Sequence, residues 1–118
     1  MELKDDNIVR IPPLDKNHKK LLLYSRFLIL HTLFYFSDDG VAYSDLKDTK
    51  KNGIPEGSLS PNLLWLKTHG YIREEPRDGN ENVYFIKSEG KTALRALMDW
   101  LDNMIKIFNK VDKDGREE

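Results

Sequence analysis

The chain has 118 residues, of which 39% are hydrophobic and 33% are charged, so it can form one compact core but not two ordinary domains. Its 19 Lys and Arg residues nearly balance its 20 Asp and Glu residues, which gives no support for a polyanionic partner unless the cations gather in a local patch. The absence of cysteine excludes disulfides, thiolate metal sites and a cysteine nucleophile, and it favours a reducing compartment, with a cytoplasmic location as the default.

A flexible arm is expected over residues 1–16. The segment 1–20 is polar, carries charges of both signs, and lacks the apolar stretch and the cleavage site of a signal peptide. The apolar segment 21–36 is shorter than the roughly 20 residues that cross a bilayer, and Arg26 and His31 interrupt it. We therefore expect a buried core helix here and no membrane partner.

The first predicted helix covers residues 17–36, where good helix formers dominate. One face repeats apolar residues at three-to-four spacing, namely Leu23, Phe27, Leu30 and Phe34. A second apolar stripe consists of Leu22, Ile29, Leu33 and Phe36. A helix that is apolar around most of its circumference must be covered on several sides, which a domain this small does not easily achieve alone. A partner subunit is the expected cover.

Two short helices are predicted next. The segment 38–40, Asp-Asp-Gly, is a turn signal, and the apolar segment 41–43 is short enough for a minor strand. Ser44 is expected to cap a brief helix through Lys51, after which Asn-Gly at 52–53 breaks the chain. The second helix has an apolar face that ends at a glycine, with Leu59, Leu63 and Leu66 before Gly70.

A hairpin and a long helix are predicted in the second half of the chain. Residues 71–74 and 83–86 have strand composition, and the segment 76–82 between them is rich in turn formers. Ser88 is expected to cap the final helix. The apolar residues of this helix recur every three or four positions, at Leu94, Leu97, Met98, Leu101, Met104, Ile105 and Phe108.

The order of these elements predicts a mainly α fold with a small β-hairpin wing, that is, an α+β winged helix-turn-helix with long first and last helices. The expected division is a winged helix-turn-helix domain over 17–87, a dimerisation helix over 88–110, and a frayed charged tail over 111–118.

The segment 57–72 is the most informative one. It begins with Gly-Ser-Leu-Ser-Pro, a pattern in which the fourth position can be any residue. Leucines three apart follow, and Gly-Tyr-Ile leads out of the helix into the wing. This pattern resembles the PadR family of regulators, and Tyr84, Ser88, Gly90 and Trp100 fit the second wing strand and the start of the C-terminal helix of that family. The first half is similar to the broader MarR-type regulators, in which a long apolar helix leads into a short strand and a Ser-Asp-Leu helix start. The resemblance implies a transcriptional regulator that binds duplex DNA.

Three polar residues open the predicted recognition helix. Pro61 is harmless in the first helical turn, and with Ser58 as the cap this leaves Ser58, Ser60 and Asn62 facing whatever lies beyond the helix start. Base edges and phosphates would suit them, although plain capping is an equally simple interpretation. The cations expected to hold phosphates, or else to form a solvated face, are Lys47, Lys50, Lys51, Lys67, Arg73 and Arg77. Trp65, on another face of the same helix, is interpreted as a packing residue.

A homodimer is expected to join through the first and last helices, which would set two recognition helices in successive major grooves about 34 Å apart. The residues assigned to this interface are Leu22, Ile29, Leu94, Leu97, Met98, Leu101, Met104, Ile105 and Phe108. Such a stripe, with Trp100, can also line a pocket for a small-molecule effector of unknown identity, but helix packing is its commoner use.

No catalytic or cofactor motif is found in the sequence. His18, His31 and His69 lie far apart and lack carboxylates at metal-ligand spacing, so we expect no metal and no cofactor. Phosphate-cradling glycine loops, nucleophile elbows and paired catalytic carboxylates are absent from the sequence, which argues against an enzyme.

The alternative function is a protein-interaction module in a larger assembly, because winged helices also serve as scaffolds. The wing favours this alternative, since Arg73 and Arg77 are accompanied by acidic residues at Glu74, Glu75, Asp78 and Glu81.

Overall fold

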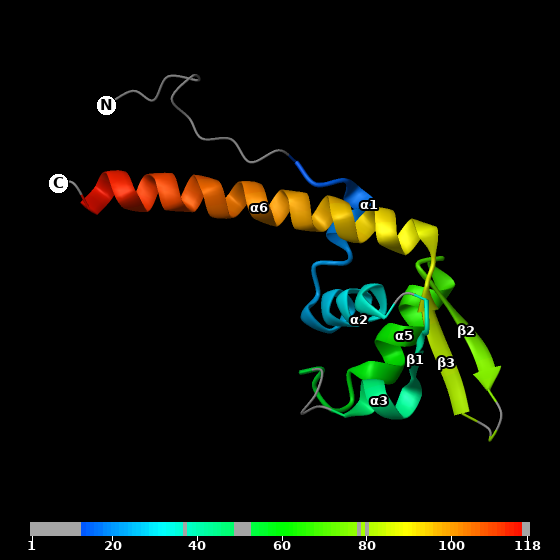
Figure 1. Ribbon diagram of the computed structural model, residues 1–118. Helices are drawn as coiled ribbons and strands as arrows, with labels where there is room; N and C mark the ends of the chain where they lie inside the picture. The colour runs from blue at the N-terminus through cyan, green and yellow to red at the C-terminus, as the bar shows by residue number, and fades with distance from the viewer. Residues whose placement is uncertain (1–12, 37, 49–52, 78, 80, 117–118) are drawn as a thin grey trace.

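The computed structural model describes residues 13–36, 38–48, 53–77, 79 and 81–116. Its elements, labelled in Figure 1, are α1 (Lys16–Lys19), α2 (Tyr24–Tyr35), β1 (Val41–Ala42), α3 (Tyr43–Lys47), α5 (Leu59–Thr68), β2 (Ile72–Arg77), β3 (Glu81–Ile86) and α6 (Ser88–Arg116). They form a compact body from which α6 projects, with α3, the start of α5 and the end of β2 on the side of the body away from α6 (Figure 1). The fold is the predicted winged helix-turn-helix.

The expected single helix over 17–36 is divided into α1 and α2. The N–H of Leu21 donates to the carbonyl of His18 at 2.9 Å, a tight turn that directs the fully buried Leu21 side chain into the core. Arg26 Nη1 donates to the carbonyl of Lys20 at 2.7 Å and so satisfies a backbone group that the break leaves without a helical partner. Residues 22 and 23 fall at this break and are exposed.

Helix α2 packs one face on its own chain. Its residues Ser25, Ile29, Leu30 and Leu33 are buried, and it contacts α5, α6 and β3. Ile29 is 0% exposed in the single chain, so its assignment to a dimer interface was wrong. The three covering elements lie far along the sequence, and the periodicity of one helix does not reveal them.

The predicted minor strand and hairpin form a three-stranded antiparallel sheet in the order β1-β3-β2. Val41 pairs with Tyr84, and Ile72 pairs with Ile86. The turn before β1 requires glycine, because Gly40 has φ +71° and a Cβ there would lie 2.6 Å from the Phe85 and Val83 side chains. The strand β2 begins one residue later than expected and continues to Arg77, while β3 begins at Glu81.

The first helix of the helix-turn-helix is capped differently from the prediction. Helix α3 begins at Tyr43 and ends at Lys47, and Ser44 lies inside it instead of capping a helix that reaches Lys51. The carboxylate of Glu81, from the wing, accepts from the backbone N–H of Ser44 at 3.2 Å. The wing therefore supplies the capping acceptor that Ala42, the N-cap residue of α3, does not provide. Lys50 and Lys51 lie outside the described residues.

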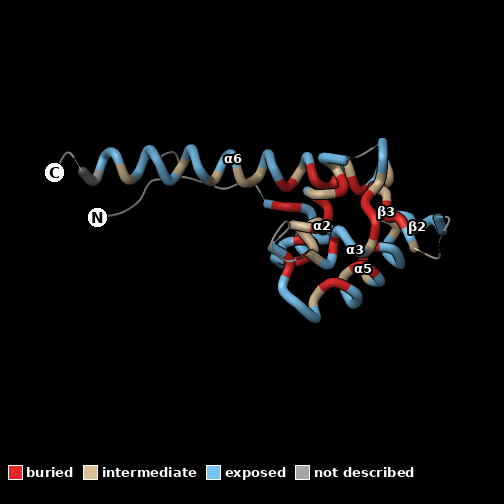
Figure 2. Tube along the Cα trace, turned by 60° about the horizontal axis from the view of Figure 1, so that its bottom comes forward, coloured by how far each residue is buried: buried red, intermediate tan, exposed pale blue. Residues whose placement is uncertain are grey.

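Helix α6 begins at Ser88 and continues to Arg116, beyond the expected end at residue 110. Its first turns pack on the body, where Leu94 and Leu97 are buried, whereas its later turns alternate between exposed and intermediate positions (Figure 2). Leu94 and Leu97 therefore belong to the core of the single chain, which corrects their assignment to the dimer interface. Ser88, the expected cap, is the first residue inside the helix, and its hydroxyl donates to the Glu89 carboxylate at 2.9 Å. Among the described residues, no helix has the length and apolarity needed to span a membrane.

Candidate nucleic-acid interface

Helix α5, the predicted recognition helix, is fixed to the body by one apolar face. Leu59, Leu63 and Leu66 are buried, as their spacing predicts. The helix ends where expected: Gly70 has φ +82°, and the N–H of Tyr71 returns to the carbonyl of Leu66 at 3.0 Å. The opposite side of α5 is left facing solvent.

Ser58 occupies the N-cap position of α5, but its side chain forms no capping hydrogen bond. Its backbone is in the helical region, and its carbonyl oxygen accepts from Asn62 Nδ2 at 2.7 Å. The expected capping role of the Ser58 hydroxyl is therefore wrong, since the N-cap side chain reaches the first-turn N–H groups most readily from an extended backbone.

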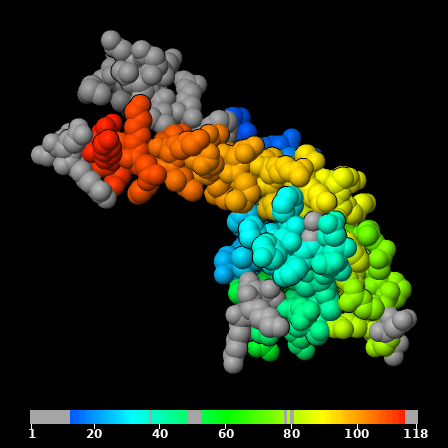
Figure 3. All heavy atoms as spheres, in the orientation of Figure 1, coloured from blue at the N-terminus to red at the C-terminus, as the bar shows by residue number. Residues whose placement is uncertain are grey.

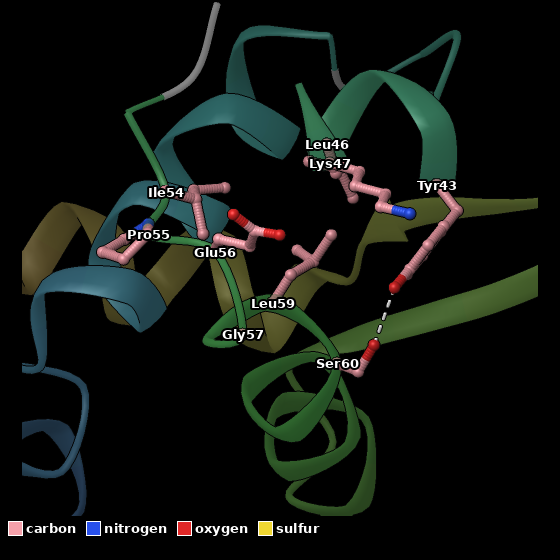
Figure 4. A pocket seen from close by; sticks show the side chains of 9 residues that line it. All are labelled: Tyr43, Leu46, Lys47, Ile54, Pro55, Glu56, Gly57, Leu59 and Ser60. Carbon is pink, nitrogen blue, oxygen red and sulfur yellow. Dashed lines mark hydrogen bonds between the residues drawn. The ribbon is translucent and has the colours of Figure 1, made fainter. Parts of the chain in front are cut away.

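Ser60 is exposed at the first turn of α5, where its hydroxyl lies 2.7 Å from the Tyr43 hydroxyl (Figure 4). This bond connects α5 to the first residue of α3. Either hydroxyl can donate, so Ser60 keeps one further hydrogen-bonding direction toward solvent. Of the three predicted base-contacting residues, it is the one classed as exposed, whereas Ser58 and Asn62 are intermediate.

Asn62 is half-buried, and both ends of its side-chain amide are used within the chain. Its Nδ2 donates to the Ser58 carbonyl, and its Oδ1 accepts from Arg26 Nε at 3.1 Å. The same guanidinium lies 3.7 Å from the centroid of the Trp65 ring. Asn62 therefore connects the start of α5 to α2, and contact of Asn62 with a base stays a prediction.

The described cations differ in how far they are already paired. Lys67 Nζ lies 2.8 Å from a Glu74 carboxylate oxygen, and Arg73 forms an ion pair with Glu75. Arg77 is exposed at the hairpin, and its charge contributes to the lowered pKa of Glu81, after the two hydrogen bonds that Glu81 accepts from Ser44. Lys47 is exposed and forms no ion pair with any residue in the described part of the chain. Among the described residues, Lys67 and Arg73 are therefore ion-paired within the chain, whereas Lys47 is not.

A pocket of about 370 Å³ lies between α3 and the start of α5 (Figure 4). Buried Leu46, Ile54 and Leu59 form its apolar wall. Lys47 from α3 and Glu56 from the segment before α5 extend over it. A more open groove of about 620 Å³ continues from Tyr43 between α3 and the wing. The predicted DNA-facing surface is thus concave and carries both signs of charge.

Four residues that organise this surface were given no role in the site from the sequence: Arg26, Tyr43, Glu74 and Tyr84. Arg26 could have been recognised as the isolated cation in the apolar segment 21–36, because a charge in a core helix requires a partner. Glu74 accepts hydrogen bonds from Lys67, Asn82 and Tyr84. These bonds, that of Lys67 first, lower the pKa of Glu74. Burial, followed by the bond to Glu74, raises the pKa of Tyr84 to about 12.

The residues assigned to dimerisation that are not buried in the core divide into two groups. Met98, Ile105 and Phe108 are 44%, 57% and 66% exposed, and Leu22 is also exposed, so these four are available to a partner. Leu101 and Met104 are intermediate. An apolar groove of about 410 Å³ runs between α2 and α6, lined by Phe27, Leu28, His31, Met98, Leu101, Asp102 and Ile105.

The described part of the chain has no cluster of potential metal ligands. No group of three or more His, Cys, Asp or Glu side chains comes together there. His69 instead stacks on Trp65, with ring centroids 3.8 Å apart, and its Nδ1 lies 2.8 Å from the Trp65 carbonyl oxygen. Trp65 is thus a packing residue, as predicted, enclosed by Arg26 and His69.

No family model matches the chain, and no curated protein matches it. Solved structures do match. The S. aureus MepR–DNA complex aligns with a TM-score of 0.64 at 17% identity, over 86% of each chain. The PcaV transcriptional regulator from Streptomyces coelicolor, solved with its natural ligand, aligns with a TM-score of 0.62 at 16% identity, over 73% of this chain and 60% of that one. A MarR-family regulator from Silicibacter pomeroyi aligns with a TM-score of 0.59 at 19% identity, over 78% of this chain and 64% of that one. The chain therefore spans under two thirds of the length of the latter two proteins, and it shares their fold.

Proposed function

We propose that this chain, whose fold is that of the MarR-type winged-helix regulators, is a sequence-specific regulator of transcription that binds duplex DNA as a homodimer. The observation that carries the proposal is the outward face of α5, where Ser60, Leu64 and Lys67 follow one another at helical spacing and are all exposed. An α-helix of this kind fits the major groove, and the wing stands on the same end of the body (Figure 1).

Leu64 adds a specific expectation to this face. Its side chain is 59% exposed, although its neighbours Leu63 and Leu66 are buried. An apolar side chain held at the centre of a recognition helix suits the C5-methyl group of thymine, which is exposed in the major groove. We infer that Ser60 and Leu64 read bases while Lys47 and Arg77 meet phosphates.

Self-association through α6 is part of the proposal. Leu94, Leu97, Leu101, Met104, Phe108 and Val111 are spaced three and four residues apart, which is the a and d pattern of a coiled coil. The first two pack on the body, but Phe108 and Val111 are 66% and 56% exposed, and the later turns of α6 project beyond the body (Figure 3). A second copy of the chain would cover these positions.

The proposal is tested by selecting duplexes from a random library with the full chain and measuring the dissociation constant of the selected sequence across a salt series. We expect nanomolar binding at moderate salt, at least about a thousandfold tighter than binding to unrelated DNA. Lys47→Glu should weaken binding, whereas Lys110→Glu, an exposed position on α6, serves as the matched control. Micromolar binding that ignores both sequence and salt would contradict the proposal.

The second candidate is a protein-interaction module, and one observation favours it. Lys67 and Arg73 are neutralised by carboxylates of the same chain, and Glu56 and Glu81 border the two grooves beside α3. This candidate would be supported by two results together. The duplex selection would fail, and a protein partner would be recovered from cell extract in stoichiometric amount with no DNA retained.

The proposal also includes a small-molecule effector that binds between α2 and α6. PcaV was solved with its natural ligand, and the apolar groove between α2 and α6 adjoins the exposed part of the α6 stripe. A ligand there would be enclosed between the body and the helix proposed for self-association.

The PadR-like assignment of the second half of the chain likewise stays a prediction.

A further inference from the structure

A single carboxylate, that of Glu74, joins the recognition helix to both strands of the wing. Glu74 is the third residue of β2, and its Oε1 accepts from Lys67 Nζ of α5 at 2.8 Å. Its Oε2 accepts from the Tyr84 hydroxyl at 3.0 Å and also from Asn82 Nδ2, both on β3. Three donors from two other elements thus converge on one side chain.

The strand register explains why these groups meet. Glu74 and Tyr84 are directly opposite in the β2–β3 pair, and Asn82 is two residues from Tyr84, so all three lie on the same face of the hairpin. This face borders a small pocket of about 100 Å³ that is also lined by Leu63, Leu64 and Lys67 of α5. The neighbouring wing residues Arg73 and Glu75 lie on the opposite face and pair with each other.

The burial of the cluster favours a fixed arrangement. The Glu74 side chain is only 21% exposed, against 44% for Lys67, so the carboxylate end of the pair is shielded from solvent. A shielded carboxylate with three donors holds its geometry better than an exposed surface pair, whose side chains move independently.

We propose that Glu74 is a positioning residue that sets the angle between the recognition helix and the wing, and that Lys67 serves this connection instead of binding a DNA phosphate. The inference rests on the proposed DNA-binding function, and it corrects the sequence-based role of Lys67. A wing held at a fixed angle can contact the DNA phosphate backbone while the recognition helix lies in the major groove. The connection therefore contributes to affinity for every DNA sequence without reading any base.

The test is a charge exchange in the full chain, using Lys67→Glu, Glu74→Lys and the double variant. Each single variant places like charges together and should weaken binding to the selected duplex by about tenfold or more. The double variant should recover affinity to within about threefold of the original, because the Tyr84 hydroxyl and the Asn82 carbonyl oxygen can accept from a lysine at position 74. A double variant as weak as Lys67→Glu alone would overturn the proposal, since it would mean that the cation at position 67 meets DNA directly.

A milder variant keeps the test valid if the charge reversals fold poorly. Lys67→Met removes the charge but keeps much of the side-chain volume. The slope of log affinity against log salt should stay unchanged in this variant, whereas a fall of about 0.9 would identify Lys67 as a phosphate contact and overturn the proposal. The exchange of Asp102 and Lys106, an exposed pair on α6 with N–O distance 2.9 Å, is the matched control and should leave affinity unchanged.

Amide hydrogen exchange without DNA separates this inference from the proposed function. Both single charge reversals should accelerate exchange in β2 and β3, and the double variant should restore protection. If the unaltered chain binds no duplex but this pattern is observed, the proposed function fails and the connecting role of Glu74 stands. Unchanged protection in the single variants would overturn that role whatever the DNA result.

Discussion

The guanidinium of Arg26 lies 3.7 Å from the centroid of the Trp65 ring and connects α2 to the middle of the recognition helix. Arg26 also donates to Asn62 Oδ1 and to the Lys20 carbonyl, so one side chain binds α5 at two positions and closes the break before α2. Desolvation by burial lowers the pKa of Arg26, which remains charged at any ordinary pH. The orientation of α5 therefore depends on a residue outside the helix-turn-helix itself.

Arg26→Ala should lower the free energy of unfolding by about 2 kcal/mol, because a cation–π contact and two side-chain hydrogen bonds are lost together. Arg26→Lys should recover only a small part of this loss, since an ammonium cannot stack on the indole and donate to both acceptors. Urea unfolding of the two variants provides the measurement. Full recovery in Arg26→Lys would mean that the positive charge alone matters.

Phe108→Lys should prevent self-association by placing a charge on the exposed apolar stripe of α6. Asn109→Lys is the matched control, because its side chain is also exposed but lies outside the stripe. Sedimentation equilibrium should give a dimer dissociation constant at least about tenfold higher for Phe108→Lys and an unchanged one for the control. Equal effects of both variants would place the interface elsewhere.

Leu97→Ala should behave as a core substitution and not as an interface substitution. Leu97 is 0% exposed in the single chain, so its truncation leaves a cavity costing about 2–5 kcal/mol of unfolding free energy. The dissociation constant of the dimer, measured where the variant remains folded, should change little. A large rise in that constant with little loss of stability would return Leu97 to the interface.

Gly90→Ala should destabilise the chain by about 2–4 kcal/mol even though alanine is the better helix former. A Cβ at position 90 would lie 2.3 Å from the Tyr71 carbonyl oxygen and 2.7 Å from Ile86 Cγ1, and a backbone oxygen cannot move aside cheaply. Gly70→Ala provides the comparison, because a Cβ there meets nothing within 4 Å and the cost is only the strain of φ +82°, about 1–2 kcal/mol. Thermal unfolding of both variants should rank Gly90→Ala as the more damaging.

Tyr84 should make stability depend on pH at the alkaline end. Its folded pKa is raised to about 12, above the unfolded value near 10, so its contribution is fully present below about pH 10 and is lost as the pH rises through about 12. The stability difference between the original chain and Tyr84→Phe should therefore shrink over this interval. Ultraviolet difference titration should show that the variant lacks one tyrosine ionisation near pH 12, and a variant that loses a step near pH 10 instead would contradict this assignment.

The sequence was sufficient for the fold because each element carried a local signal. The leucines of α5 have helical spacing, Gly70 ends that helix, and turn formers separate β2 from β3. The break between α1 and α2 was missed because good helix formers dominate residues 17–36. Burial of Leu21 in the tertiary structure, not local preference, stops the helix there.

The candidate site was harder to predict because its polar contacts join residues far apart in the chain. Arg26 and Asn62 are separated by 36 positions, and Ser44 and Glu81 by 37. A lysine such as Lys67 has the same sequence signature whether it faces a phosphate or a carboxylate of its own chain. Only the packing of α5 against β2 reveals that Glu74 reaches it.

The strand order β1-β3-β2 leaves β2 on the outside of the sheet, and β2 carries Arg73, Glu75, Arg77 and Pro76. Pro76 has no N–H to offer an incoming strand, and alternating charges make a flat apolar ribbon impossible. The other rim, β1, is only two residues long. Both rims of the sheet therefore disfavour the addition of a strand from another molecule, so the proposed pairing through α6 would not have to compete with fibril growth.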